Sequence, residues 1–245
     1  MSSAATTKTL EAILFDCDGV LADTERDGHR LAFNEAFKQK GIDEFWDVER
    51  YGKLLEVGGG KERMAAHWNE VGWPDVMPID DAERQARVKE LHLLKTDIFN
   101  RMITEGAIPL RPGVLRLVDE AIQNDATLAV CSTSSEQAVT NLVKVLMGEK
   151  RASKFSIFAG DMVSKKKPAP DVYNMAVEQL KLDKSRCVIV EDTEIGLKAA
   201  KAAGISCIVT KSAYAHNEDF TGANMVVDNL GEEEGITIAT LAGLL

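Results

Sequence analysis

The segment Ile13–Glu25 reads ILFDCDGVLADTE, and it decides how the rest of the chain is interpreted. An apolar run ends abruptly in two aspartates, Asp16 and Asp18, which are separated by a cysteine. Strand interiors disfavour aspartate, and a buried carboxylate is costly unless something positive meets it. The segment therefore predicts a buried strand that ends in a site where the two acids have a positive partner.

Length and charge limit the classes of protein that fit this sequence. The chain has 245 residues, 45% of them hydrophobic, which suits one large domain or two unequal ones. Its net charge of -10 argues against a nucleic-acid binder, but a local basic pocket can still hold a small anion. No apolar stretch is long enough to span a bilayer. We therefore expect a small-molecule ligand, with no nucleic acid and no membrane.

Two further features bear on the compartment. The four cysteines (Cys17, Cys131, Cys187 and Cys207) lie in or beside apolar runs and form no CxxC pair, so we expect reduced core residues in a non-oxidising compartment. The first ten residues, MSSAATTKTL, are small and hydroxylated and carry no apolar leader, so they do not predict a signal peptide. They fit either a trimmed organelle leader or a frayed terminus, and the residues alone favour the second.

Short apolar runs alternate with amphipathic helical stretches from Thr127 onward. The runs are TLAVC, FSIFAG, CVIVED, SCIVT and MVVD, and ILFD belongs to the same set. Such runs, separated by helices, predict a parallel sheet that is covered on both faces. The fold class is therefore α/β.

The segment between the first strand and the second has a different character. It carries all three tryptophans and predicts helices over Arg26–Lys38, Lys61–Val71 and Ala82–Ile103. Pro112, in LRPGV, is typical of a helix start and marks the return to the α/β pattern. The organisation predicted is a core of residues 1–22 and 107–245, with residues 23–106 inserted as a helical cap.

The carboxyl ends of the predicted strands carry complementary chemistry. Ligands bind at these ends in open parallel sheets, so Asp16 and Asp18 should meet Glu191 and Asp192, which end CVIVED. Converging carboxylates need a cation between them, and hard oxygen ligands suit Mg2+. Two other strand ends supply the hydroxyls of STSS (132–135) and, within KKKPAPD, Lys167, which suit a phosphate. Together these groups predict a phosphoryl-transfer site.

Four segments of the chain resemble the motifs of the haloacid dehalogenase (HAD) superfamily in order and spacing. They are DCDGVLADTE, CSTSS, KKKPAPD and VEDTEIGLKAAKAAG, and the resemblance covers nearly the whole chain. It implies a Rossmann-like parallel sheet core with an inserted C1-type helical cap. The cap stretches GGGKERM and HWNEVGWP are similar to those of the CbbY-like phosphatases. That similarity implies hydrolysis of xylulose-1,5-bisphosphate, a Rubisco inhibitor, and a chloroplast stroma location with the leader removed, or a cytoplasmic one as in bacterial members.

The resemblance also assigns roles to residues. It makes Asp16 the nucleophile that forms an aspartyl phosphate, and Asp18 the general acid and then the base. The Mg2+ ligands would be Asp16, the backbone carbonyl of Asp18, Asp192 and the nearby Glu191. Ser132 and Lys167 would hold the transferring phosphoryl group, and Thr133 would add a substrate hydrogen bond or fill space.

Residues of the predicted cap are more ambiguous. The glycines before Lys61 suggest an anion site at a helix start, where Lys61 and Arg63 would grip a second phosphate. The competing interpretation is a helix cap with two solvated charges, and the residues favour neither. Glu25 and His29 are four apart and share a helix face, so both could contact substrate, and Arg111 lies near the return to the core.

Three rival functions remain after this interpretation. A sugar-phosphate mutase of the β-phosphoglucomutase type uses the same nucleophile, and the core motifs do not separate it from a phosphatase. A non-catalytic binding protein would have no need of Asp16, Asp18, Lys167 and Asp192 together. A dehalogenase is disfavoured because it would not need the acids of the second strand. We expect a monomeric phosphatase of a small sugar bisphosphate.

Overall fold

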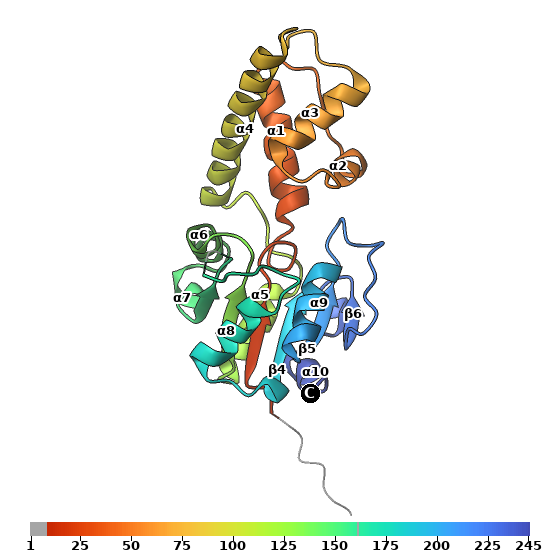
Figure 1. Cartoon of the computed structure of the whole chain (residues 1–245). Coiled ribbons are helices and arrows are strands. Elements are labelled where there is room, and N and C mark those ends of the chain that lie inside the picture. The colour runs from red at the N-terminus through yellow and green to blue at the C-terminus, as the bar shows by residue number, and fades with distance from the viewer. Residues whose placement is uncertain (1–8, 161) are drawn as a thin grey trace, which may run out of the picture. The chain divides into compact units, whose positions relative to one another are not determined.

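The computed structural model describes residues 9–160 and 162–245 (Figure 1). Most of the N-terminal stretch on which the leader question turns therefore lies outside the described residues. The chain divides into two compact units. The first consists of the N-terminal segment as far as Asp23 together with Pro109–Leu245, and the second consists of Thr24–Ile108. The two units are described separately below.

The first unit contains a six-stranded, all-parallel sheet of order β3-β2-β1-β4-β5-β6. The strands are β1 (Ala12–Phe15), β2 (Thr127–Cys131), β3 (Phe155–Phe158), β4 (Cys187–Glu191), β5 (Ser206–Thr210) and β6 (Met225–Val227). All residues of β1 and β4 are buried, as expected for central strands of a sheet covered on both faces. The α/β class predicted from the apolar runs is confirmed, and β1 is flanked by β2 and β4.

Helices follow the strands and cover the sheet. They are α5 (Val114–Gln123), α6 (Glu136–Met147), α7 (Glu149–Ala152), α8 (Asp171–Leu180), α9 (Glu194–Ala203) and α10 (Ile238–Ala242), with 3-10 turns η2 (Lys184–Arg186) and η3 (Glu232–Glu234). Helices α8 and α9 pack on the sheet face that carries Ala12 and Leu14. The intervening Ile13 and Phe15 alternate to the other face, where Phe15 meets the ring of Phe155.

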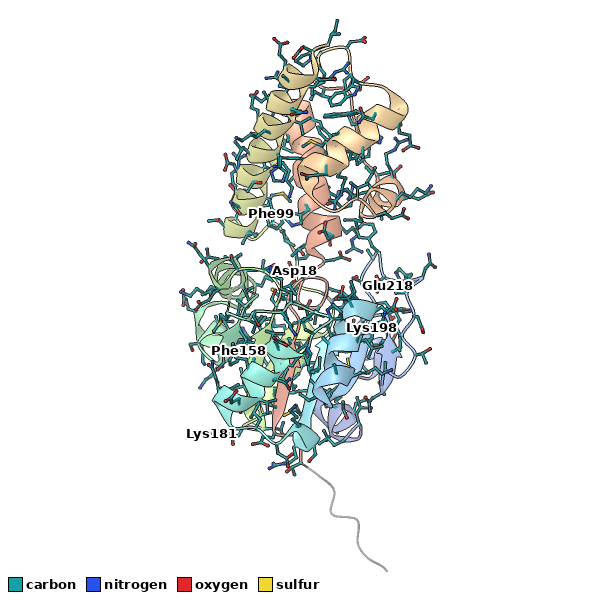
Figure 2. The ribbon with its side chains drawn as sticks, in the orientation of Figure 1. Asp18, Phe99, Phe158, Lys181, Lys198 and Glu218 are labelled. Atoms are coloured by element: carbon teal, nitrogen blue, oxygen red, sulfur yellow. The ribbon has the colours of Figure 1, made fainter. Side chains whose placement is uncertain are left out.

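The second unit is entirely helical in its regular structure. It contains a π-helical turn η1 (Thr24–His29), α1 (Arg30–Gln39), α2 (Val48–Leu54), α3 (Gly60–Val71) and α4 (Asp81–Thr104). Its core is aromatic: Phe33, Phe37, Trp46, Tyr51 and Trp68 are all fully or almost fully buried and contact one another. Figure 2 shows the side chains of both units, with Phe99 on α4 and Phe158 at the end of β3. Among the described residues, no helix combines the length and apolarity that a membrane span requires.

Most predicted elements of the cap are present, with two differences. The helices predicted over Lys61–Val71 and Ala82–Ile103 are found to within one residue at each end, as α3 and α4. The helix predicted over Arg26–Lys38 is instead a π turn followed by α1, and α2 was not predicted. Helix α2 has only seven residues, VERYGKL, so it offers too few turns for an apolar periodicity to be recognised.

Gly113 tests how tightly the start of α5 packs. It lies at the N-cap of α5 with φ +81°, and a Cβ there would lie 1.8 Å from the backbone oxygen of Leu230. We expect Gly113→Ala to lower the free energy of unfolding by about 3–4 kcal/mol, from left-handed strain and from overpacking against backbone. Gly204→Ala, at φ +72° with nothing within 4 Å, is the matched control and should cost about 1–2 kcal/mol. Equal losses in denaturant unfolding would contradict the packing argument.

Candidate active site

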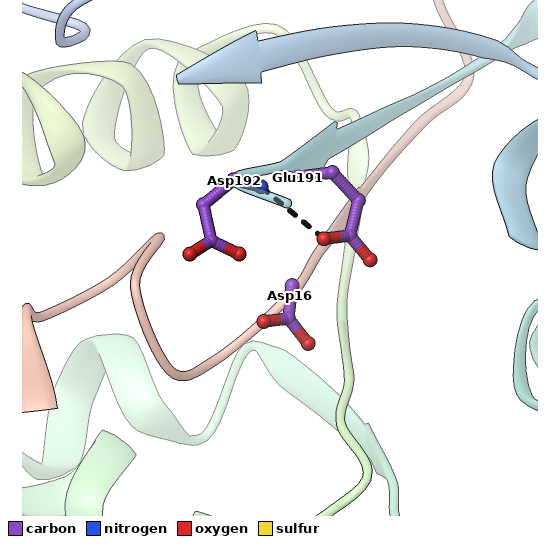
Figure 3. Close-up of side chains that lie close together, drawn as sticks. All are labelled: Asp16, Glu191 and Asp192. Atoms are coloured by element: carbon purple, nitrogen blue, oxygen red, sulfur yellow. Dashed lines mark hydrogen bonds between the residues drawn. The ribbon is translucent and has the colours of Figure 1, made fainter. Parts of the chain in front are cut away.

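Three acidic side chains come together where β1 and β4 end. The two strands are paired in parallel register, Phe15 opposite Val190, so the residues that follow emerge side by side. Carboxylate oxygens of Asp16, Glu191 and Asp192 all lie within 4.8 Å of one another. Figure 3 shows these three carboxyl groups turned toward a common space, with the backbone N–H of Asp192 donating to Glu191 Oε2 at 3.2 Å. Of the four acids predicted to converge, Asp16, Glu191 and Asp192 form this group among the described residues, and Asp18 does not belong to it.

An ammonium group lies among these acids. Lys167 Nζ donates to Asp16 Oδ1 at 2.5 Å, to Glu191 Oε1 at 2.7 Å and to the carbonyl oxygen of Cys131 at 2.8 Å. Its side chain is 5% exposed, and the three contacts use all three donors of the ammonium. Lys167 is therefore positioned, as the sequence predicted, and it is one positive partner of the acids that end the first and fourth strands.

Burial sets the electrostatics of this cluster. It raises the pKa of Asp16 to about 7, with Lys167 acting to lower it and Glu191 to raise it. Burial also raises the pKa of Asp192, and the charges of Asp16 and Glu191 add to the effect. Although burial alone would lower it, the two carboxylates raise the pKa of Lys167 above its usual value. The lysine is thus held as a cation among acids that resist full ionisation.

The donor set fits a divalent cation. Three carboxylates face one ammonium, so the cluster carries two more negative groups than positive ones when all are ionised. All three acids are buried, and burial followed by the charges of neighbouring acids raises the pKa values of Asp16 and Asp192. A small hard cation with oxygen ligands would supply that charge, and Asp16 and Asp192 would hold it with Glu191 nearby.

Two glycines let backbone approach the acids closely. Gly19 follows the aspartates at φ +85°, and a Cβ there would lie 1.9 Å from Asp192 Oδ2. Gly196, in the first turn of α9, would place a Cβ 1.9 Å from Glu191 Oε2. Any side chain at either position would displace a carboxylate, so both glycines shape the site.

The hydroxyl-rich loop after β2 reaches the second aspartate. Asp18 Oδ2 accepts a hydrogen bond of 2.9 Å from the hydroxyl of Ser134. Ser132 is buried, and its Oγ accepts from the backbone N–H of Ser134 at 3.1 Å. Thr133 is exposed, and its carbonyl oxygen accepts from the surface residue Lys166. The loop thus orients Asp18 through Ser134, a contact that sequence reasoning did not identify.

The helical unit contains its own buried cation. Lys95, on α4, is 7% exposed, and its Nζ lies 2.7 Å from His29 Nδ1. The ammonium also lies 4.9 Å from the ring centroid of Phe33 and 5.2 Å from that of Phe99. Burial lowers the pKa of Lys95 to about 8, and burial followed by the charge of Lys95 lowers the pKa of His29 to about 3. His29 is therefore neutral with Nδ1 as acceptor, which leaves its ring proton on Nε2.

A second chain of polar contacts lies in the same unit. The hydroxyl of Tyr51 donates to Glu25 Oε2 at 2.7 Å and accepts from Arg63 Nη1 at 2.9 Å. Arg63 Nε donates to the carbonyl oxygen of Leu54 at 2.9 Å, and its guanidinium lies over the ring of Tyr51. Arg63 is buried, so the structure does not support the interpretation of this residue as a solvated charge.

The glycine run before α3 has a packing explanation. A Cβ at Gly60 would lie 2.7 Å from the His92 ring, and a Cβ at Gly59 would lie 2.3 Å from Glu62 Oε2. Lys61 is exposed, whereas the carboxylate of Glu62 lies beside the start of the helix. These contacts favour the helix-cap interpretation of Gly59 and Gly60, and the role of Lys61 toward substrate stays a prediction.

Arg111 has a structural position in the first unit. Its guanidinium donates to the carbonyl oxygens of Thr210, Lys211 and Asp228 at 2.7–2.8 Å, and also to that of Gly19. Its backbone N–H donates to Leu21 O at 2.9 Å. Arg111 thus ties the loops after β1, β5 and β6 together, and its predicted contact with substrate stays untested.

Several residues of the site were not found from the sequence. Lys95, Tyr51, Ser134 and Tyr173 each contact a predicted site residue, yet each comes from an ordinary helix or loop sequence. A signal existed only for Ser134, which lies two residues after Ser132 in the same loop. The others are brought in by tertiary packing.

Comparison with known proteins extends these observations. Residues 10–204 match the family model described as haloacid dehalogenase-like hydrolase. A protein of Arabidopsis thaliana called CBBY-like protein is 53% identical over 246 residues, covering 100% of this chain and 77% of its own. A crystal structure of CbbY from Rhodobacter sphaeroides with phosphate is 41% identical, with a TM-score of 0.71 over 95% of this chain and 99% of that one. A second, of a CbbY mutant with xylulose-(1,5)bisphosphate, has 40% identity, the same TM-score and the same coverage.

The acidic cluster predicts a stability effect in the absence of divalent cations. In the presence of chelator at pH 8, Asp192→Asn should raise the free energy of unfolding by about 1–3 kcal/mol, because it removes a buried charge that the other acids repel. The pKa of Asp192 is raised on folding. Its contribution to the stability of the wild type is therefore fully present below its ordinary pKa of 3.8 and is lost as pH rises. The advantage of the variant should therefore vanish at pH 3–4, where the measurement is repeated.

A matched control and a metal titration complete this measurement. Asp228→Asn, whose side chain is 62% exposed, should change the unfolding free energy by no more than about 0.5 kcal/mol. Adding divalent cation should stabilise the wild type by about 2–3 kcal/mol at one hundred times its dissociation constant, and the Asp192 variant much less. A destabilised Asp192→Asn, or equal stabilisation of both proteins by the cation, would contradict the assignment.

Proposed function

Because this chain belongs to the haloacid dehalogenase-like hydrolases, we propose that it is a Mg2+-dependent phosphatase whose substrate is a small sugar bisphosphate, namely xylulose-1,5-bisphosphate. The observation that carries the proposal is the contact of the Lys167 ammonium with Asp16 Oδ1 beside the acids Glu191 and Asp192. The bisphosphate bound to the similar CbbY mutant supports the choice of substrate. The product would be xylulose 5-phosphate, so that the enzyme removes a Rubisco inhibitor.

The proposed reaction has two balanced steps. A carboxylate oxygen of Asp16 attacks phosphorus, the bond between phosphorus and the sugar oxygen breaks, and Asp18 gives its proton to that oxygen. Asp18 then takes a proton from water, which attacks the aspartyl phosphate and releases inorganic phosphate with the carboxylate restored. Mg2+, when bound, would neutralise charge on the transferring group.

The residues around Asp16 prepare it for this chemistry. The raised pKa of Asp16, about 7, means that positive charge is needed to keep the nucleophile ionised in a buried site. Lys167 supplies part of this charge through its 2.5 Å contact. We expect Lys167 and the buried hydroxyl of Ser132 to bind the phosphoryl oxygens, while Ser134 donates a hydrogen bond to Asp18.

A bisphosphate needs a second anion site, and the helical unit offers one. Two buried cations, Arg63 and Lys95, lie in the helical unit, where Glu25 bonds the same Tyr51 hydroxyl as Arg63 and acts to raise the pKa of Lys95. Among the described residues, the Lys95 ammonium forms a hydrogen bond with His29, which uses one of its three donors. A buried cation without a full set of acceptors is costly unless an anion binds it. We assign the second phosphate to this cluster.

We also propose a compartment for the enzyme, the chloroplast stroma. The substrate arises where Rubisco works, which supports the chloroplast stroma, and the similarity to a plant CBBY-like protein agrees with it. A cytoplasmic location is the alternative. Fractionation of the tissue that makes the protein, followed by immunodetection, tests the choice.

The nucleophile assignment is tested by Asp16→Asn. The change removes the attacking oxygen at nearly constant size, so turnover of xylulose-1,5-bisphosphate should fall by at least about 10³-fold while the fold is kept. Phosphate release is measured with Mg2+ and with EDTA, and wild-type activity should be lost in EDTA. A folded variant that turns over at the wild-type rate would refute the nucleophile, and EDTA-resistant activity would refute the metal.

The product identifies the reaction type. The wild type is supplied with a sugar monophosphate and a trace of the corresponding bisphosphate, and free phosphate is measured together with isomerised sugar phosphate. The proposal expects free phosphate. Isomerised sugar phosphate as the main product would favour the mutase.

The second anion site is tested by Lys95→Met. It should lower kcat/KM for the bisphosphate by about thirty- to several-hundred-fold, which corresponds to about 2–4 kcal/mol for a buried charged contact. Hydrolysis of p-nitrophenyl phosphate should change little, because that substrate has one phosphate. The exposed Lys61 provides the comparison, and we expect Lys61→Ala to cost less than Lys95→Met. A larger loss with Lys61→Ala would move the second phosphate to the start of α3.

Stability provides an independent readout of the same variant. The pKa of Lys95 is lowered from 10.5 to about 8 on folding, so holding its charge at pH 7 costs folding free energy. Lys95→Met should therefore raise the free energy of unfolding at pH 7 by about 1–2 kcal/mol. Wild-type stability should recover this cost as pH rises from 8 to 10.5, because the unfolded chain binds more protons there. A destabilised variant would mean that Lys95 serves the fold.

A further inference from the structure

A buried tyrosine lies under the lysine that contacts Asp16. Tyr173, on α8, is fully buried, and its hydroxyl donates to Glu191 Oε1 at 2.5 Å. The Lys167 ammonium lies 4.9 Å from the centroid of the Tyr173 ring. Tyr173 therefore contacts both members of the Lys167–Glu191 ion pair, through its hydroxyl on one side and its ring face on the other.

One oxygen of Glu191 is shared between two donors. Oε1 accepts from Tyr173 at 2.5 Å and from Lys167 at 2.7 Å, while Oε2 accepts from the Asp192 N–H. The absence of a Cβ at Gly196 leaves room for the carboxylate, since a Cβ there would lie 1.9 Å from Glu191 Oε2. The Glu191 carboxylate is held by these contacts. The neutral Tyr173 hydroxyl satisfies part of the negative charge on Oε1, and Lys167 is the other donor to that oxygen.

We infer that Tyr173 is a positioning residue for phosphoryl transfer. Its hydroxyl holds the Glu191 carboxylate, and the position of that carboxylate determines how closely the Lys167 ammonium approaches Asp16. The inference rests on the proposed function, since it takes Asp16 as the nucleophile. The hydrogen bond and the ring contact of Tyr173 are made with Glu191 and Lys167, and neither is made with Asp16 or Asp18. Without the hydroxyl, Glu191 Oε1 loses one of its two donors in a buried site and draws the ammonium toward itself. The contact between Lys167 Nζ and Asp16 Oδ1 then lengthens, and the site for the transferring phosphoryl group is weakened.

Tyr173→Phe tests this role because it removes the hydroxyl and keeps the ring under Lys167. We expect kcat to fall by about 10- to 100-fold, the loss typical of a hydrogen bond to a charged group, with KM changed by less than about threefold. The same fall is expected with p-nitrophenyl phosphate, because the contact serves the phosphate that is transferred. The effect is therefore independent of which sugar bisphosphate is the natural substrate.

Val172→Ala is the matched control for packing. Val172 precedes Tyr173 on α8, is 2% exposed, lies in the same core cluster and has no polar side-chain atom that could bond to the ion pair. It should lower the thermal midpoint more than Tyr173→Phe does, yet keep kcat within about twofold. A wild-type kcat in Tyr173→Phe, or a kcat loss in Val172→Ala of the same size, would overturn the positioning role.

A double variant shows whether Tyr173 acts through Glu191. In a Glu191→Gln background the charge on which Tyr173 acts is gone, so adding Tyr173→Phe should change kcat by less than about twofold. An undiminished 10-fold loss in that background would overturn the inference.

A crystal structure of Tyr173→Phe separates this inference from the proposed function. It should show Lys167 Nζ displaced from Asp16 Oδ1, whether or not any substrate is turned over. An unmoved ammonium would refute the positioning role even if the enzyme is the phosphatase proposed. An inactive wild type with the displaced lysine in the variant would refute the function and leave the positioning role supported.

Discussion

The buried ammonium of Lys167 is the interaction on which the site depends. Its three donors join the end of β1, the end of β2 and the end of β4 through Asp16, the Cys131 carbonyl and Glu191. Without it, acids from two neighbouring strands would converge in a buried space and lose the cation that acts to lower the pKa values of Asp16 and Asp192. The parallel order β2-β1-β4 brings these strand ends together. The fold that forms the site therefore also brings like charges close to one another, and Lys167 partly neutralises them.

The remaining negative charge has a functional consequence. Asp16 and Asp192 retain raised pKa values despite Lys167, because both are buried and lie near other acids. A divalent cation and a phosphoryl group bring charges of opposite sign that such a site can accept together. The close approach of Gly19 and Gly196 leaves the acids the room that they occupy, since a Cβ at either glycine would lie 1.9 Å from a carboxylate oxygen.

The helical unit also buries charged side chains, but there the buried charges are positive. Its aromatic core buries Lys95 and Arg63 against ring faces, which solvate a cation far less well than water does. The neutral His29 accepts from the lysine and adds no charge of its own. Each unit thus holds a buried cluster whose charge is incomplete, acidic in the sheet unit and basic in the helical one.

The sequence by itself determined the α/β class, the six strands, most of the helices and the acids at the ends of two strands. These features are local: an apolar run of four or five residues marks a strand buried on both faces, and the residues at its end are read directly. It also placed Lys167, because a lysine fixed before a proline follows a strand end. Only the tertiary structure decided which atoms meet. Tyr173 reaches Glu191 across 18 residues and Lys95 reaches His29 across 66, and both lie on helices where their neighbours in sequence give no sign of it. The same holds for Arg111, whose carbonyl partners lie on loops about a hundred residues away. Such contacts depend on how helices pack on the sheet or on one another, and a periodic pattern specifies the buried face of a helix without specifying the partner that it buries.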